Sequence, residues 1–126
     1  MLYDRLVLDL IQAEEALRVV QKYEQSPEWV ADSEQRVQQQ NQRMEARAAA
    51  PELLTHAQDI VMELRTTLDV DAWSGGPALA DLYSWLLSEM MAANIARDPD
   101  RVAACRALVE PLRDTWREAA AAAVAG

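Results

Sequence analysis

The chain has 126 residues, of which 51% are hydrophobic, so it is long and apolar enough for one folded domain with a sizeable core. Its formal net charge of −9, with a single lysine, provides no basic patch and argues against nucleic acid and anionic membranes as partners. One cysteine excludes an intrachain disulfide, and no apolar run approaches the ~18 residues that cross a bilayer, so we expect a cytosolic protein without membrane insertion. Scarce glycine, abundant alanine and scattered β-branched residues favour helices over strands.

The first predicted helix covers residues 2–24. Its apolar side chains recur at steps of three and four, which places them along one face. This face contains Tyr3, Leu6, Leu10, Ala13, Leu17 and Val20. Ser26 and Pro27 are typical of an N-cap and a first helical turn, so a second helix is expected to start there.

The segment 27–47 is polar on almost every side. Val30, Val37 and Met44 recur every seven residues, but the positions between them are polar, which is typical of a helix that projects into solvent or makes a thin contact. The segment either extends the first helical hairpin or forms an extra helix. Pro51 ends this pattern, and it either kinks one long helix or begins a new one.

Dense apolar stripes predict three more helices. They cover residues 51–69, 77–97 and 99–118. Gly75 and Gly76 precede Pro77, which indicates a tight turn that needs a positive φ. Asp98 is expected to cap the last helix, Pro111 to bend it, and the alanines after residue 118 to fray.

Short connections between long amphipathic helices place neighbouring helices antiparallel. No internal repeat or linker divides the chain. The sequence therefore predicts an all-α antiparallel up-and-down four-helix bundle, with an extended first hairpin or an extra helix, folded as one domain over residues 1–126.

Reactive side chains are too sparse to predict an enzyme. His56 is the only histidine, and no set of relay partners accompanies it. Glu52 and His56 form one Glu–His pair where a di-iron bundle needs two, and a zinc site needs more ligands than His56 and Cys105. We expect no catalysis, no metal and no cofactor, with His56 partly exposed on a helix surface and Cys105 in the core.

Six short segments of the chain form a series. They are MLYD at 1–4, HAQDIVMELRTTLDVD at 56–71, GG at 75–76, LYSWLL at 82–87, AANIARDP at 92–99 and LRDTWREA at 112–119. Each alone is compatible with any helical bundle, but in this order and spacing the series resembles the FliS family of flagellar export chaperones. The resemblance covers about residues 1–22 and 52–119 and leaves the polar segment 25–50 without a counterpart.

The resemblance implies a cytosolic helical bundle that binds the C-terminal segment of flagellin and prevents polymerisation before type III flagellar secretion, without catalysis or cofactor. A disordered apolar segment of this kind fits the hydrophobic grooves between helices of a rigid bundle. Proteins of the family usually carry a stretch before MLYD that covers part of the groove. A groove without that cover is expected to support self-association, because monomers rarely leave large apolar patches bare.

The client surface is expected around the first helix and its neighbours. The predicted contact residues are Tyr3, Leu6, Leu10, Leu54, Ile60, Leu64, Leu82, Leu86 and Met90. Some of them must build the core instead, and the sequence does not separate the two groups. The alternative function is a generic helical interaction or dimerisation module that acts through segment 27–47.

Five polar or aromatic side chains carry separate expectations. Tyr3 and Tyr83 are expected at the edge of the core, with hydroxyl groups that reach a partner. Asn94 lies on an otherwise apolar helix face and is expected to brace a neighbouring loop through a hydrogen bond. Trp116 is expected in the core, and Asp4 is expected to cap a helix or to pair with an arginine of another helix.

Overall fold

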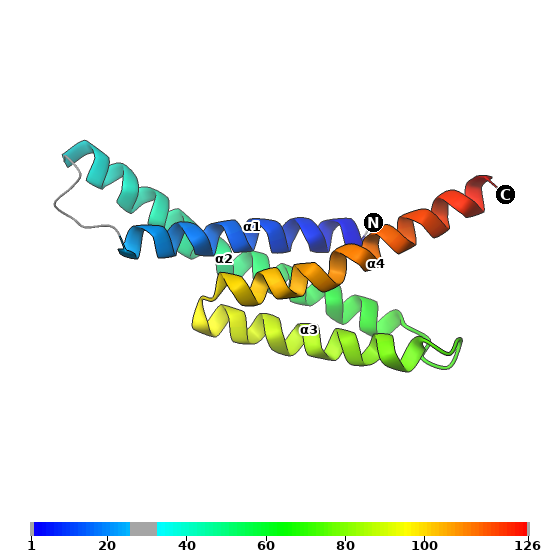
Figure 1. Ribbon diagram of the computed structural model, residues 1–126. Helices are drawn as coiled ribbons and strands as arrows, with labels where there is room; N and C mark the ends of the chain where they lie inside the picture. The colour runs from blue at the N-terminus through cyan, green and yellow to red at the C-terminus, as the bar shows by residue number, and fades with distance from the viewer. Residues whose placement is uncertain (1, 26–32, 126) are drawn as a thin grey trace.

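The computed structural model describes residues 2–25 and 33–125. They form four helices, α1 (Leu2–Gln25), α2 (Ser33–Thr67), α3 (Gly76–Ala96) and α4 (Pro99–Ala125). Each helix packs antiparallel against the next, and α4 returns to pack on α1 (Figure 1). The predicted all-α four-helix bundle is confirmed. The helix start expected at Ser26 and Pro27, and also Val30, lie outside the described residues.

Helix α2 is continuous over 35 residues, about 52 Å at 1.5 Å per residue. It passes through Pro51, so of the two alternatives for the polar segment the structure has the extended first hairpin and not the extra helix. Ala50 and Leu54 lie on either side of this proline and are both buried, so packing against the core holds the helix together where one backbone hydrogen bond is lost. Figure 1 shows the N-terminal part of α2 projecting beyond the other helices.

The projecting part of α2 contacts the end of α1 through polar side chains. The Tyr23 hydroxyl donates to Gln42, and Arg43 donates to Glu24 at 3.5 Å. Apolar side chains on this part, Val37 among them, remain largely exposed. The predicted thin contact is confirmed.

The core lies along the axis of the ring of helices. The stripe predicted for α1 is buried throughout, and Cys105 of α4 is fully buried, as expected. Burial, with a smaller contribution from the charge of Glu89, raises the pKa of the Cys105 thiol to about 12, so this thiol stays protonated and behaves as a small apolar side chain. Asp9 of α1 is also fully buried, and its partners are described below.

The turn before α3 depends on its glycines for a different reason from the one predicted. Gly75 has φ −84°, and no described glycine has a positive φ, so that prediction is wrong. A Cβ atom on Gly76 would lie 2.2 Å from the carbonyl oxygen of Val70, and one on Gly75 would overlap the ring of Trp73. Close approach of the Val70 backbone, and not backbone freedom, therefore requires glycine at position 76, whereas the exposed ring of Trp73 can move aside at position 75.

Helix α4 begins at the predicted cap and ends later than predicted. The carboxylate of Asp98 accepts a hydrogen bond from the backbone N–H of Asp100 at 2.9 Å, as an N-cap does. Figure 1 shows α4 changing direction near its middle, where the ring of Pro111 removes one backbone hydrogen bond. The helix continues to Ala125, seven residues beyond the predicted end, in line with the high helix propensity of alanine.

Candidate binding surface

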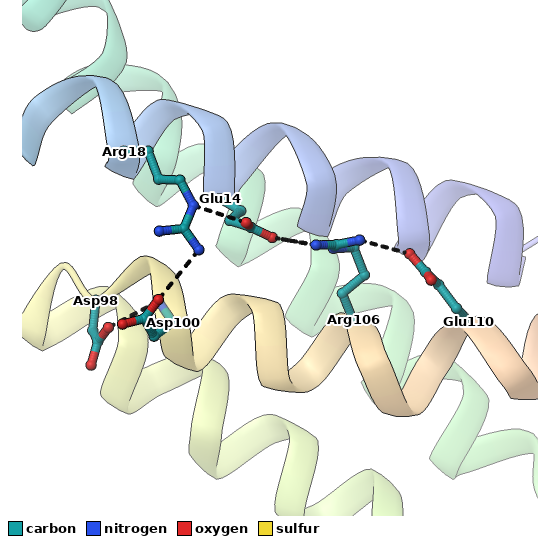
Figure 2. A network of polar contacts seen from close by, with 6 residues as sticks. All are labelled: Glu14, Arg18, Asp98, Asp100, Arg106 and Glu110. Carbon is teal, nitrogen blue, oxygen red and sulfur yellow. Dashed lines mark hydrogen bonds and ion pairs between the residues drawn. The ribbon is translucent and has the colours of Figure 1, made fainter. Parts of the chain in front are cut away.

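The seam between α1 and α4 is closed by charged side chains. Figure 2 shows Glu14 of α1 between two arginines: Arg106 of α4 donates to it at 2.8 Å and Arg18 donates to it at 2.9 Å. Arg18 also reaches Asp100 at 3.3 Å, and Arg106 reaches Glu110 at 3.1 Å. These bonds tie α1 to α4 with charged side chains along this part of the seam.

The charge state of Glu14 is set by this network. Burial acts to raise the pKa of Glu14, but the hydrogen bonds from Arg18 and Arg106 together outweigh burial and lower the pKa below its usual value. The carboxylate therefore stays ionised at neutral pH. The hydrogen bonds between Glu14 and the two arginines therefore do not depend on pH near neutrality.

The seam between α1 and α2 also carries charged side chains, and Arg5, Asp9 and His56 line a cavity of about 360 Å³ there. The buried carboxylate of Asp9 bonds Nδ1 of His56 on α2 and lies 3.3 Å from Nε of Arg5. His56 is half-exposed on the surface of α2, which confirms its predicted position, although its partner on α1 was not foreseen. No group of three or more potential metal ligands occurs among residues 2–25 and 33–125.

Aromatic side chains join α1, α3 and α4 at one end of the bundle. The hydroxyl groups of Tyr3 and Tyr83 hydrogen-bond each other within the core, which confirms the prediction that each reaches a partner. Burial and this hydrogen bond raise the pKa of Tyr83. The ring of Trp116 stacks on Tyr3 with centroids 6.4 Å apart, but Trp116 is 45% exposed, so its predicted place in the core is wrong. Asp4 pairs with Arg117 of α4, as expected.

The register between α3 and α4 follows from one ion pair. Arg101 of α4 donates to Glu89 of α3 at 3.0 Å, so these positions face each other across the seam. The two helices are antiparallel, so seven residues from Glu89 toward the N-terminus of α3 correspond to seven residues from Arg101 toward the C-terminus of α4. Leu82 of α3 is therefore opposite Leu108 of α4. Trp85 is one turn from Leu82 on the same side of α3, and therefore also faces α4.

Apolar side chains continue along α4 beyond this point. Leu108, Leu112 and Trp116 succeed one another at steps of four and so share one side of the helix. Together with Leu82 and Trp85 they form what we call the α3–α4 surface. Trp85 is 41% exposed and Leu108 is 43% exposed, while Leu82 and Leu112 are half-buried against the core. This surface is apolar and accessible, and the only ion pair that crosses its seam in the described part of the chain lies at one end.

Most of the predicted contact residues lie elsewhere. Seven of the nine are core residues with at most 7% of their surface exposed. These seven are Tyr3, Leu6, Leu10, Leu54, Ile60, Leu86 and Met90. Leu64 and Leu82 are half-buried, and only Leu82 belongs to the α3–α4 surface. A client can therefore reach two of the nine side chains without displacing the core.

Four of the five residues of the α3–α4 surface are not among the contact residues predicted from the sequence, namely Trp85, Leu108, Leu112 and Trp116. Leu108 and Leu112 belong to the apolar side of the helix predicted over residues 99–118, and Trp116 is expected from the sequence in the core. Trp85 lies off the main stripe of α3, which runs through Leu79, Tyr83 and Leu86. An aromatic residue beside an apolar stripe that is already complete is the signal that could have indicated this surface.

Comparison with known proteins agrees with the resemblance. A family model described as "Flagellar protein FliS" matches residues 1–123, and so includes the polar segment of α2. No curated protein and no solved structure gave a significant match. Among the described residues, no helix is both long enough and apolar enough to cross a membrane. The match covers nearly the whole chain and all four helices, and the chain therefore belongs to the FliS family of flagellar proteins.

Proposed function

We propose that this protein binds the C-terminal segment of flagellin in the cytosol and keeps flagellin from polymerising before its export. Membership of the FliS family supports a role as a flagellar export chaperone. The observation that carries the finer proposal is the α3–α4 surface, where leucine and tryptophan side chains remain accessible at helical spacing. Such a surface suits an amphipathic helix whose apolar side chains recur at three- and four-residue steps.

The energetics of such binding suit a temporary complex. A flagellin segment that is disordered when free must become ordered on the surface, which costs about 2–5 kcal/mol of the contact energy. The affinity is then lower than the buried area alone suggests, so the segment can be released without catalytic work by the chaperone. The proposal needs no reactive group and no cofactor.

The test is co-expression with flagellin from the same genome. We expect the affinity-tagged chain to retain full-length flagellin on a column and to lose it when the last ~40 residues of flagellin are removed, a length that forms enough helix to span the bundle. Retention of the truncated flagellin at the same level would place the contact elsewhere in flagellin. Absence of any retention would contradict the proposal.

The alternative, an interaction module on segment 27–47, has one observation in its favour. Val37 and Met44 are 57% and 68% exposed and share one side of the projecting part of α2. This alternative predicts that deletion of segment 27–47 abolishes partner binding while flagellin is ignored. The flagellin proposal predicts that flagellin binding survives the same deletion, provided that circular dichroism shows the remaining helices intact.

Self-association is a further expectation for the free protein. The α3–α4 surface holds two tryptophans that no described residue covers fully, and exposed apolar patches favour contact between copies. We expect dimers at high concentration in size-exclusion chromatography with light scattering, and their loss when the flagellin segment is added. A monomer at every concentration would count against this expectation.

A further inference from the structure

A cavity of about 310 Å³ lies where α1, α2 and the end of α3 meet, away from the α3–α4 surface. Its volume is at the lower end of the roughly 300–1,000 Å³ found for ligand pockets. Three buried apolar side chains contribute to its wall, Leu17 and Val20 of α1 and Ala50 of α2. The cavity therefore offers an apolar lining that an aliphatic side chain could fill.

Positive charge gathers at the same cavity. Arg47 of α2 and Arg97 at the end of α3 both line it, and none of the described residues that line it is acidic. Within the described part of the chain, neither guanidinium group makes a hydrogen bond or ion pair, in contrast to Arg18 and Arg106, which each bind two carboxylates. Both arginines are exposed, and in a protein with a net charge of −9, two guanidinium groups without carboxylate partners at one cavity favour an anionic ligand.

Asn94 adds a neutral polar group to this cavity. It is half-buried, and its side chain forms no hydrogen bond with a described residue, so the loop bracing expected from the sequence is not observed. Its amide can donate to a ligand oxygen. The C-terminal end of α3 is the negative end of the helix dipole, so the arginine and asparagine side chains, and not the backbone, must supply the attraction for an anion.

The backbone at Arg97 supports a role for this side chain. Arg97 ends α3 in the left-handed conformation, with φ 52° and ψ 47°, and it is the only described residue other than glycine with a positive φ. Glycine is the usual residue at this position, because a side chain there is sterically unfavourable. The chain keeps a guanidinium group at the cavity despite that strain, which suggests that the group is used.

We propose that this cavity binds the C-terminal carboxylate of flagellin together with the apolar side chain of a terminal residue. The carboxylate pairs with Arg47 and Arg97 and accepts from Asn94, while the apolar side chain contacts the wall formed by α1 and α2. This inference rests on the proposed function and names where the end of the bound segment lies. A segment of ~40 residues reaches it easily, since Trp85 and Ile95 are about 15 Å apart along α3.

The experiment compares two synthetic peptides that carry the last ~40 residues of flagellin, one with a free C-terminal carboxylate and one with a C-terminal amide. Binding to the full chain is measured by isothermal titration calorimetry. We expect the free acid to bind about tenfold more tightly than the amide, because charge-assisted hydrogen bonds are lost in the amide. In the double variant Arg47→Gln with Arg97→Gln, the two peptides are expected to bind equally.

The matched control is Arg65→Gln. Arg65 is an exposed arginine of α2, eighteen residues beyond Arg47 and thus about 27 Å away, and its guanidinium group also has no partner among the described residues. This variant removes one positive charge from α2, as Arg47→Gln alone does, and the tenfold preference for the free acid is expected to persist in it.

Three outcomes overturn the inference. Equal binding of acid and amide to the unaltered chain rejects the carboxylate contact while leaving the proposed function intact. A preference for the acid that survives in the double variant places the carboxylate at another site. Failure of both peptides to bind rejects the proposed function and the inference together, and so differs from the first two results.

Discussion

Replacement of Trp85 and Leu108 by serine is expected to weaken binding of the flagellin segment by at least about 100-fold. Both side chains lie on the α3–α4 surface, where a bound helix would remove them from water. Truncation of a large apolar anchor costs about 1.5–3 kcal/mol, and each 1.4 kcal/mol corresponds to a factor of ten in affinity. Calorimetric titration with the flagellin peptide measures this loss.

Stability is expected to change little in the same variant. Trp85 and Leu108 are each more than 40% exposed, and substitutions at such positions usually change the free energy of unfolding by about 0.5 kcal/mol or less. Thermal unfolding followed by circular dichroism therefore separates lost contact from lost fold. A large drop in melting temperature would show that both side chains belong to the core.

The control for this double variant is Val37→Ser with Met44→Ser. These side chains are at least as exposed as Trp85 and Leu108, and they lie on the projecting part of α2. The control removes apolar surface from the polar segment and leaves the α3–α4 surface unchanged, so binding is expected to remain within about twofold. An equal loss in both double variants would instead favour the interaction module on segment 27–47.

Leu86→Ala is expected to lower the free energy of unfolding by about 3 kcal/mol, within the 2–5 kcal/mol typical of large-to-small changes in a core. Leu86 is 1% exposed and packs in the core between the helices, so the substitution leaves a cavity that rigid helices fill only in part. For a domain of this size the melting temperature should fall by roughly 10 °C. Chemical denaturation gives the free energy directly.

The comparison variant is Leu64→Ala, at a position that is half-buried near the end of α2. It removes the same atoms from a site that solvent already reaches, so the loss of stability is expected to be less than half that of Leu86→Ala. Peptide binding is then measured at a temperature where both variants are folded. Lost binding by a fully stable Leu86→Ala would contradict the assignment of Leu86 to the core and restore it to the contact surface.

The assignment of residues to the core shows what sequence periodicity cannot predict. Steps of three and four mark the apolar side of each helix, and Leu10, Leu54 and Met90 all lie on such a side. Periodicity does not predict how much of that apolar side the neighbouring helices bury. Leu86 and Trp85 are adjacent in sequence, yet one is enclosed and the other faces solvent, because α4 covers one side of α3 incompletely.

Hydrogen bonds and ion pairs between helices also cannot be predicted from periodicity. Glu14 and Arg18 form an i, i+4 pair that the sequence suggests, but their bonds to Arg106 and Asp100 depend on the antiparallel contact of α1 with α4. The same holds for Asp9 and His56, which lie 47 positions apart. An isolated charge on an apolar face cannot be interpreted until its partner on another helix is known.

The sequence by itself determined the helical class, the cap at Asp98 and membership of the FliS family. These depend on local propensity, apolar spacing and the order of short motifs. Only the tertiary structure decided that α2 continues through Pro51, that Gly76 is required by the close approach of Val70, and which apolar residues remain accessible. The physical reason is that the burial of a side chain depends on the other helices that pack against it. A side chain becomes core or contact surface according to which helix lies over it, and that arrangement is set by all four helices together.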